Sequence, residues 1–456
     1  MNIVFEKGLP LYEQIYRAIK KDIQEGVLSE NTKLPSKRQL SDQLGVSVNT
    51  VDGALSRLQS EGYIEIKPKS GCYVTRINAL QRLDIALPVE HREIGERSFE
   101  VDFSPADVEK EHFPYAVWRK ILRQTFDEND GDILKYPDSQ GDYGLRQAIA
   151  LYLRQSRGID CRAEQIIIGS GTSCLLRCIC GIIDKSAAVV TEDPVYNRAY
   201  NIFSGMGHTC RAISTEKSGE IRGKLEKTGG DVFYVTPSHQ FPLGYSLPAP
   251  VRIELLNWAA EKEGRYIIED DYDSEFRYGA KPLTPIKSMD KNEKTVYIGT
   301  FSKCIAPSVR ISYALLPAPL LERYRKTGSV YLSAVSGMEQ RAVREFITGG
   351  HFERHINRMR NIYAKKQKKL LECLGKSVKI MGENAGHHIL ISLDKYSEQE
   401  LLQRAADLSV KVYPVSGYFI REVPEKYRSA VLLGYGALTE KDIEKGVSLL
   451  KKAWEI

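Results

Sequence analysis

The chain has 456 residues, of which 42% are hydrophobic and 27% charged, an ordinary balance for a globular protein. That length predicts about two or three domains at roughly 150 residues each. The formal net charge of +6 is compatible with nucleic-acid binding but does not by itself argue for it. No run of about 18 apolar residues occurs, and residues 1–10 lack the pattern of a signal peptide, so we expect a cytoplasmic protein.

Eight cysteines are scattered along the chain. Three of them, Cys174, Cys178 and Cys180, cluster in an expected helix without C-x-x-C pairs or nearby histidines. Cysteines in such a setting are usually small apolar core residues, whereas metal sites need closely paired ligands. We therefore expect a reduced protein with no metal site.

The first part of the chain carries the pattern of two helices. Apolar residues recur at four-residue spacing over residues 11–27, which predicts an amphipathic helix. Ser36 can cap a second helix over residues 37–44, and Gly45 can end it because glycine readily adopts the left-handed conformation of a helix terminus. A short helix that ends at a glycine is typical of the first half of a helix-turn-helix.

A third helix is expected to open at Ser47 and run to residue 59. Its expected inner stripe consists of Val48, Val51, Leu55 and Leu58. The opposite face is polar and presents Ser47, Asn49 and Thr50. A helix with this division can pack its apolar side on the first two helices and leave its polar side for DNA.

A hairpin is expected after the third helix. Residues 63–66 and 72–74 are strand-like, and the turn between them carries Lys67 and Lys69. Helix spacing, turn and hairpin agree with one another, which favours a winged helix over an ordinary three-helix domain with a solvated polar face. Up to Arg76 there are 11 Lys and Arg against 9 Asp and Glu, so one copy should bind DNA weakly and a dimer is needed.

The rest of the chain divides into a linker and a large domain. Residues 76–100 alternate short apolar stretches with charges and are not rich in Gly and Ser, so we expect a partly ordered linker between a domain of residues 1–75 and one of residues 101–456. The large domain alternates strand-like and helical stretches, which predicts an α/β fold with a mostly parallel sheet. The clearest strand candidates are residues 165–168, 187–191, 232–235, 266–268 and 295–298.

Chemistry-bearing residues follow these strands, and ligands of open α/β sheets collect at the carboxyl ends of the strands. Lys303 follows one strand and stands close to Thr300, Ser302 and Arg310. A lysine that forms a Schiff base with pyridoxal phosphate needs a cationic and hydroxyl-rich anchor for the cofactor phosphate nearby. A lone lysine is usually a solvated surface charge, but this one precedes an apolar run. The pattern therefore indicates a pyridoxal-phosphate site.

Two other turns can complete such a site. Gly171, Thr172 and Ser173 follow a strand and open a helix, so their backbone N–H groups can hold a phosphate, although any strand-to-helix turn can be glycine-rich. Asp270 ends an apolar strand and can pair with the pyridine nitrogen. Its alternative is a loop carboxylate that caps a helix.

Two tyrosines are candidates for contacts with the cofactor ring. Tyr196 follows a strand and can lie over the pyridine, and Tyr272 can hydrogen-bond the ring oxygen. Ordinary packed tyrosines are the alternative for both.

The head resembles the GntR-type winged helix over residues 10–75. The resemblance is carried by Leu34-Pro35-Ser36-Lys37-Arg38, Leu44-Gly45-Val46-Ser47, Thr50-Val51, Leu58 and Glu61-Gly62-Tyr63. It implies that Ser36, Arg38 and Thr50 bind phosphates, and that Ser47 and Asn49 face bases in the major groove. The two lysines of the wing can add backbone or minor-groove contacts.

The large domain resembles class I aminotransferases of the aspartate aminotransferase fold and, more closely, the regulators called MocR or GabR. The motifs include Tyr136-Pro137, Arg157-Gly158, Thr-Pro-Ser-His-Gln-Phe-Pro at 236–242, Glu-Asp-Asp-Tyr-Asp-Ser-Glu-Phe-Arg-Tyr at 269–278 and Leu433-Gly434-Tyr435. The run at 269–278 is especially specific to that family. With the head, the resemblance covers nearly the whole chain. It implies pyridoxal 5′-phosphate on Lys303 and a homodimer with its sites at the dimer interface, and it allows heads swapped onto the partner.

Two departures from the aminotransferase pattern count against efficient transamination. Leu432 stands where the enzymes have an arginine for the substrate α-carboxylate, and leucine cannot make a bidentate clamp. Phe241 stands where they have an asparagine that hydrogen-bonds the ring oxygen, which leaves Tyr272, with His239 or Gln240 nearby. A second arginine of the GABA-responsive member is matched by Arg198.

We therefore expect a PLP-dependent transcriptional regulator that binds promoter DNA as a homodimer through its winged helix. It is expected to sense PLP itself or an amino compound, with Arg198 and His239 as effector contacts. One alternative is a true aminotransferase with an accessory head, which Leu432 disfavours. The other is a DNA-binding protein with a dead cofactor site, which the intact lysine and its anchors disfavour.

Overall fold

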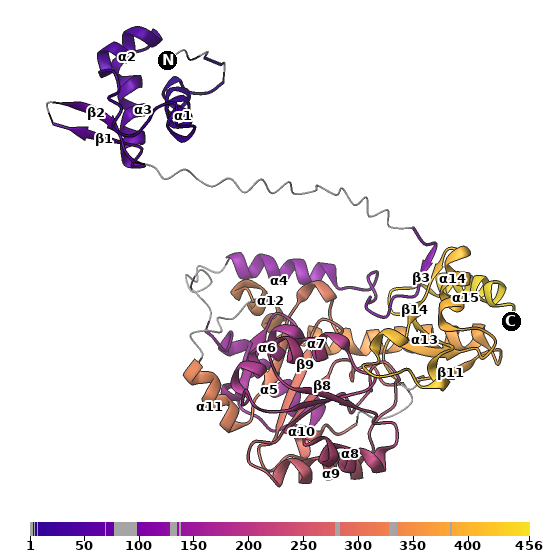
Figure 1. Ribbon diagram of the computed structural model, residues 1–456. Helices are drawn as coiled ribbons and strands as arrows, with labels where there is room; N and C mark the ends of the chain where they lie inside the picture. The colour runs from indigo at the N-terminus through magenta and orange to yellow at the C-terminus, as the bar shows by residue number, and fades with distance from the viewer. Residues whose placement is uncertain are drawn as a thin grey trace. The chain divides into compact units, whose positions relative to one another are not determined.

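The computed structural model describes residues 3, 5–6, 8–68, 70–76, 98–127, 135, 138–278, 283–327, 335–383 and 385–456. They belong to two compact units, Met1–Gly95 and Glu96–Ile456, which are described separately (Figure 1). Lys69, Tyr136-Pro137 and residues 77–97 of the expected linker lie outside the described residues. Among the described helices, none is long and apolar enough to cross a membrane.

The first unit is a three-helix domain with a two-stranded wing. Its elements are α1 (Leu11–Gln24), α2 (Lys37–Leu44), α3 (Val48–Ser60), β1 (Ile64–Lys67) and β2 (Gly71–Val74). The two strands pair antiparallel, with Ile64 opposite Val74. Apolar residues of all three helices share one core with Ile64 and Val74. The expected winged-helix arrangement is therefore present.

The local signals at α2 are confirmed. The Ser36 hydroxyl accepts from the Gln39 backbone N–H while the Gln39 side chain accepts from that of Ser36, which satisfies two N–H groups at the helix start. Gly45 ends the helix with φ 65°, the left-handed region that glycine tolerates. One expectation is wrong: Val48 is 42% exposed, because it begins α3 and lies outside the hydrophobic cluster of the head.

The second unit is built on a seven-stranded sheet with the order β4-β10-β9-β8-β7-β5-β6. The strands are β4 (Ile166–Gly169), β5 (Val189–Glu192), β6 (Cys210–Ile213), β7 (Val232–Val235), β8 (Tyr266–Asp271), β9 (Thr295–Thr300) and β10 (Ser312–Leu315). β10 runs opposite to the other six strands, so its pairs with β4 and β9 are antiparallel and the remaining pairs are parallel. The five expected strands are all present, whereas β6 and β10 were not expected.

Helices cover both faces of this sheet, which is why most of its strand residues are apolar. Ile166 and Ile168 face one hydrophobic cluster, which includes residues of α5 and α12, and Ile167 between them faces the other, which includes residues of α6 and α7. The helices are α4 (Tyr115–Asp127), α5 (Tyr143–Arg157), α6 (Thr172–Ile182), α7 (Asn197–Gly205), α8 (Ile221–Thr228), α9 (Ala249–Ala260), α10 (Ile286–Met289), α11 (Ala318–Thr327) and α12 (Gly337–Thr348). Two-sided burial leaves the strand ends as the place for polar chemistry.

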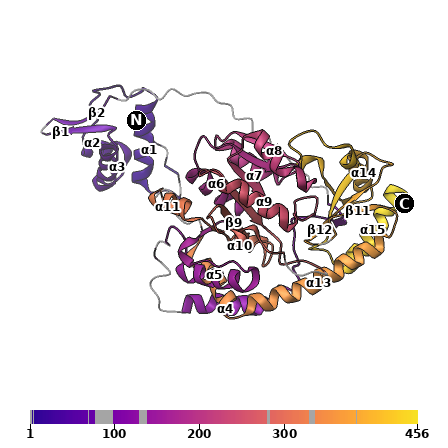
Figure 2. The ribbon, with the colours of Figure 1, turned by 90° about the horizontal axis from the view of Figure 1, so that it is seen from below.

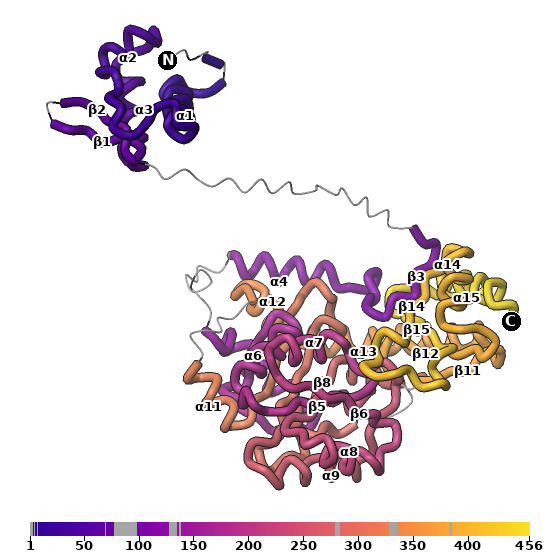
Figure 3. The backbone as a smooth tube through the Cα atoms, viewed as in Figure 1, coloured from indigo at the N-terminus to yellow at the C-terminus, as the bar shows by residue number. Residues whose placement is uncertain are grey.

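A smaller C-terminal layer completes the unit. The long helix α13 (His351–Leu374) leads from the sheet to this layer (Figure 2). The layer contains β11 (Lys379–Met381), β12 (His388–Ser392), α14 (Glu398–Asp407), β13 (Val410–Lys411), β14 (Tyr413–Pro414), β15 (Ala430–Gly434) and α15 (Glu440–Trp454). The start of the large unit, β3 (Val101–Asp102), pairs with β13, so the first and last parts of this unit lie side by side (Figure 3).

Candidate functional site

A cavity of about 340 Å³ lies where several strands of the large sheet end. All ten residues that the sequence suggested for the cofactor line it: Gly171, Thr172, Ser173, Tyr196, Asp270, Tyr272, Thr300, Ser302, Lys303 and Arg310. Arg198 lines the same cavity, and His239 does not. The fold thus brings together residues from four segments at the ends of strands, while the role of each residue stays a prediction.

One end of the cavity is rich in anion-binding groups. Gly171 precedes α6 with φ 81°, and a β-carbon there would lie 2.8 Å from Nη2 of Arg310. Glycine therefore lets the guanidinium approach the start of α6, where unpaired backbone N–H groups and the helix dipole already favour an anion. Thr300 Oγ1 accepts from the backbone N–H of Ser302 and from the hydroxyl of Ser312, and the Ser302 hydroxyl is buried without a partner among the described residues. This end has the donors that a phosphate group needs.

Asp270 is a buried carboxylate with one free oxygen. Its Oδ2 accepts a hydrogen bond of 2.6 Å from the Tyr234 hydroxyl, and its Oδ1 has no partner among the described residues. Burial, together with the nearby Asp271 and Asp273, raises the pKa of Asp270 to about 7. A protonated ring nitrogen is the kind of partner that such an oxygen lacks. Asp270 lies in β8 and caps none of the described helices.

Lys303 lies three residues beyond the end of β9. Its ammonium donates to the backbone carbonyls of Pro105 and Ala106 at 2.9 and 3.0 Å. Burial lowers its pKa, although Asp273 and Asp107 favour the charged form. A depressed pKa makes more of the neutral amine available as a nucleophile, and the two carbonyls hold the nitrogen beside the cavity.

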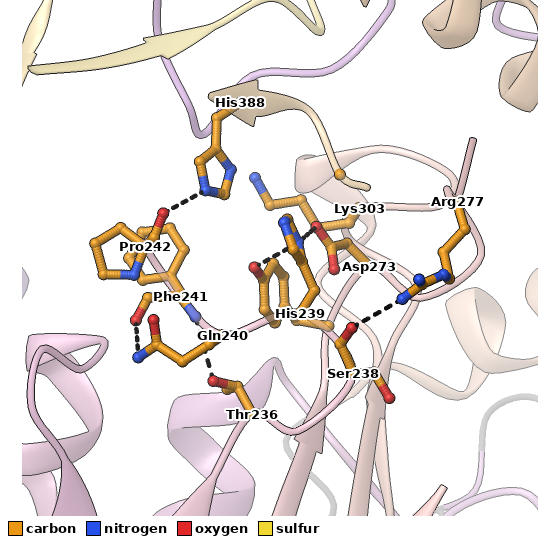
Figure 4. A network of polar contacts seen from close by, with 12 residues as sticks. Thr236, Ser238, His239, Gln240, Phe241, Pro242, Asp273, Arg277, Lys303 and His388 are labelled. Carbon is orange, nitrogen blue, oxygen red and sulfur yellow. Dashed lines mark hydrogen bonds and ion pairs between the residues drawn. The ribbon is translucent and has the colours of Figure 1, made fainter. Parts of the chain in front are cut away.

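His239 lies behind the cavity wall. Its Nδ1 is 2.8 Å from Oδ2 of Asp273 and 3.0 Å from the hydroxyl of Tyr272, two residues that do line the cavity (the contact with Asp273 is drawn in Figure 4). His239 therefore contacts the cavity lining through these two neighbours and does not line the cavity itself, and its expected contact with an effector stays a prediction. Gln240, which follows it, donates instead to the backbone carbonyls of Pro194 and Phe241.

Leu432 brings no polar group to the cavity. The residue lies in β15, is fully buried, and packs in a cluster with Leu243, Leu390 and Val415. It is not among the residues that line the cavity. The position that would hold a carboxylate-binding arginine in the aminotransferase pattern is thus part of an apolar core.

Several lining residues were not expected as site residues. They are Pro105, Ala106, Tyr234, Thr236, Phe241, Asp273, Pro307, His387, His388 and Tyr418. Tyr234 could have been found, because it lies on β7 beside the strand that carries Asp270. His388 and Tyr418 come from the C-terminal layer, and no spacing in the sequence links that layer to this edge of the sheet.

The residues suggested for DNA binding lie at two helix starts and on the wing. Ser36 and Arg38 are exposed at the start of α2, and Ser47 and Asn49 are exposed at the start of α3. The hydroxyl of Thr50 lies 2.8 Å from that of Ser47, which also caps α3. Lys67, on β1, is exposed and paired with Glu65 at 2.8 Å.

Fold and site define a class: a DNA-binding winged helix joined to an aminotransferase-like domain. The comparisons with known proteins agree. The family model described as bacterial regulatory proteins, gntR family, matches residues 11–74, and that of aminotransferase class I and II matches residues 105–448. The chain therefore belongs to the MocR/GabR-type regulators, in which a GntR winged helix is fused to an aminotransferase-like domain.

Similar proteins that are transcriptional regulators support this assignment. The HTH-type transcriptional regulator YdeL of Bacillus subtilis is 39% identical, over 98% of this chain and 97% of that one. The probable rhizopine catabolism regulatory protein MocR of Rhizobium meliloti is 30% identical over 98% and 94%, and the pyridoxine biosynthesis regulator PdxR of Corynebacterium glutamicum is 31% identical over 84% and 83%. Kynurenine aminotransferase of Pyrococcus horikoshii, solved with PMP, superposes with a TM-score of 0.69 at 25% identity over 79% of this chain and 92% of that one.

The protein is thus a transcriptional regulator that binds DNA through its GntR domain, and its cofactor is pyridoxal 5′-phosphate. The groups that line the cavity also fit that cofactor, independently of the comparisons. The free oxygen of Asp270, the donors around Arg310 and the buried amine of Lys303 match the ring nitrogen, phosphate and aldehyde carbon respectively.

Proposed function

We propose that the protein acts as a cytoplasmic homodimer whose grip on promoter DNA changes when PLP or an amino compound binds in the cavity. One observation carries the proposal: a full set of cofactor-binding groups shares a chain with a DNA-binding head, yet Leu432 is buried in an apolar cluster. A relative that regulates pyridoxine biosynthesis supports PLP itself as one signal.

In this proposal each residue that the sequence suggested for the cofactor or effector and that lines the cavity has one task. Bound PLP supplies an electrophilic carbon that amines can attack. Lys303 is its attachment point, Asp270 keeps a proton on the ring nitrogen, Tyr196 stacks on the ring and Tyr272 donates to the ring oxygen. The phosphate is held by Gly171, Thr172, Ser173, Thr300, Ser302 and Arg310. Arg198, exposed at the cavity, is the candidate contact for a carboxylate on the effector.

The head is proposed to use two kinds of contact. Ser36, Arg38 and Thr50 bind phosphates, Ser47 and Asn49 face bases, and the lysines of the wing add backbone contacts. Exposure at two helix starts supports this division, because helix N-termini attract phosphates. The small positive excess of one head supports a dimer, since two heads double the number of neutralised phosphates.

Effector binding is proposed to shift the large unit between two states that hold the heads differently. A ligand shifts such an equilibrium only as far as its affinities for the two states differ. A catalytic aminotransferase with an accessory head is the second candidate, and the buried Leu432 argues against it. A dead cofactor site is disfavoured by the free oxygen of Asp270, which a purely structural carboxylate would not leave without a partner.

The test compares DNA binding with and without PLP for the wild type, Lys303→Ala and the control Lys185→Ala, which removes an exposed lysine. The wild type and the control should show a visible absorbance band that borohydride removes, with added mass on Lys303, and their DNA affinity should change with PLP. Lys303→Ala should stay colourless and lose that response. A wild type that stays colourless with PLP, or whose DNA binding ignores it, contradicts the proposal.

A further inference from the structure

We propose that the amino compound sensed in this cavity is a primary amine with an aromatic or apolar body and no carboxylate. The inference rests on the proposed function, because it names the ligand class of the same site. It concerns the part of the cavity wall that the cofactor assignments do not use, formed by Phe241, Asp273, His387, His388 and Tyr418. Three features of this wall lead to the proposal.

The first feature is a group of aromatic rings centred on Phe241. Its ring centroid lies 4.9 Å from that of Tyr418, 5.4 Å from His388, 5.9 Å from Tyr272 and 6.2 Å from Tyr196. All four pairs are edge-to-face, an arrangement that aromatic rings prefer. Because all five residues line the cavity, a ligand body that enters it meets a mostly apolar wall. Such a wall favours a flat or apolar group.

The second feature is the charge state of the histidines. Nε2 of His388 lies 3.2 Å from the carbonyl oxygen of Pro242, as Figure 4 shows. A carbonyl only accepts, so Nε2 carries the hydrogen and Nδ1 is left as an acceptor. Burial lowers the pKa of His388 to about 3 and that of His387 well below its usual value, so both rings are neutral. Neither offers a charge to a carboxylate.

The third feature is the small number of cations. Among the described lining residues only Arg198, Lys303 and Arg310 are cationic. Lys303 and Arg310 are assigned to the cofactor. Arg198 is exposed, as Arg310 is, with its guanidinium carbon 6.0 Å from the ring centroid of Tyr196, so a carboxylate on the effector would have this one cation as its partner. The wall also carries the carboxylate of Asp273, which repels a second anion.

Together, these three features make an amino acid an unfavourable ligand for this cavity. An α-carboxylate that entered this wall would lose its water and meet a lone pair, an anion and apolar rings. An unpaired buried carboxylate is strongly disfavoured. The ammonium of a simple amine is favoured at this wall, because the carboxylate of Asp273 attracts it towards the end of the cavity that holds the cofactor. The geometry therefore selects the amine over the amino acid.

The first experiment uses the full-length protein loaded with PLP and two matched ligand pairs. 2-Phenylethylamine and L-phenylalanine share a body and differ in the α-carboxylate, and butylamine and γ-aminobutyrate differ in a distal one. Calorimetry and the visible absorbance of the cofactor measure affinity. Each amine should bind at least about tenfold more tightly than its acid partner, and phenylethylamine more tightly than butylamine. Equal or tighter binding of either acid overturns the proposal.

Variants test which residues cause the preference. Leu432→Arg should favour L-phenylalanine over the amine, while Leu151→Arg, the same change at an exposed position of α5, should alter nothing. If Leu432→Arg does not fold, His388→Arg places a cation on the cavity wall and should produce the same reversal. Phe241→Ala should weaken phenylethylamine more than butylamine. A folded His388→Arg or Phe241→Ala protein that leaves its preference unchanged contradicts the assignment of these residues.

DNA binding separates this inference from the proposed function. If promoter affinity responds to PLP or to amino acids but not to amines, the ligand class is wrong and the sensing role stands. If amines bind with the expected preference and promoter affinity never changes, the sensing role is wrong and the ligand class stands.

Discussion

At the scale of one residue, Asp270 shows how a group kept for binding can lower the stability of the folded protein. Its carboxylate is buried with one oxygen unsatisfied, and burial raises its pKa from 3.8 to about 7. The folded protein then holds a proton that the unfolded chain releases. Two more buried carboxylates nearby, Glu192 and Glu269, also have pKa values raised to about 7 by burial. The cavity without its cofactor is therefore a source of instability at neutral pH.

The corresponding prediction concerns pH. The pKa of Asp270 is higher in the folded protein, about 7, than in the unfolded chain, 3.8. Its contribution to the free energy of unfolding therefore falls as the pH rises from 3.8 through about 7. Asp270→Asn should leave PLP-free protein about as stable as the wild type near about pH 4, and more stable near about pH 8 by as much as about 4 kcal/mol. Urea unfolding at both pH values measures this difference. Asp394→Asn, at an exposed position, is the control, and equal shifts for both variants contradict the argument.

At the scale of elements, two helix starts are the proposed places for the cofactor phosphate and for DNA. Gly171 opens α6 at the cavity, and Ser47 opens α3 on the head. Each start has the positive end of a helix dipole, which favours a phosphate, although at α3 the Thr50 N–H is already bonded to the Ser47 hydroxyl. The same backbone chemistry would thus serve cofactor and DNA.

The prediction for the head separates phosphate contacts from base contacts. Arg38→Ala should lower affinity for all DNA sequences and reduce the salt slope by about one unit, whereas Asn49→Ala should change base preference. Arg17→Ala removes an exposed arginine of α1 and serves as the control. Affinity against salt concentration and a selection of bound sequences provide the two measurements. An Asn49 variant that weakens all sequences equally would assign that residue to the backbone instead.

Elements also show what could be predicted from sequence. Continuous apolar runs, such as β7, were found. Two four-residue strands were missed: β6, at the sheet edge, has the exposed Arg211 among apolar residues, and β10, although buried, begins with Ser312. Motifs directly after strands, such as Lys303, reached the cavity because parallel strands end at one edge. His388 could not be found, because it enters from another layer whose packing no local pattern encodes.

At the scale of the molecule, the two compact units predict separable activities. A chain that begins near residue 98 should still bind PLP on Lys303, because every residue that lines the cavity lies beyond that point. It should not bind the promoter, since the head is missing. Two half-sites roughly 34 Å apart, or a multiple of that distance, are expected for the full-length dimer. Footprinting of both proteins measures this, and protection of the same promoter by the shortened chain would rule out the head as the DNA-binding unit.

Also at the scale of the molecule, transamination activity distinguishes a regulator from an enzyme. Leu432 leaves the substrate carboxylate without a bidentate partner, and the loss of one partner in a buried charged pair commonly costs about 2–5 kcal/mol, or a factor of tens to thousands in binding. Transamination of amino acids with keto acids should therefore be absent or very slow in the wild type. Leu432→Arg should raise affinity for α-amino acids and favour slow conversion of the cofactor to its pyridoxamine form, seen in the absorbance spectrum.

Arg198→Ala should weaken the change in DNA affinity on effector binding only if the effector carries a carboxylate, so an unchanged response fits PLP or a simple amine. Rapid turnover by the wild type would make the protein an aminotransferase with a DNA-binding head, and the sensing proposal would lose its basis.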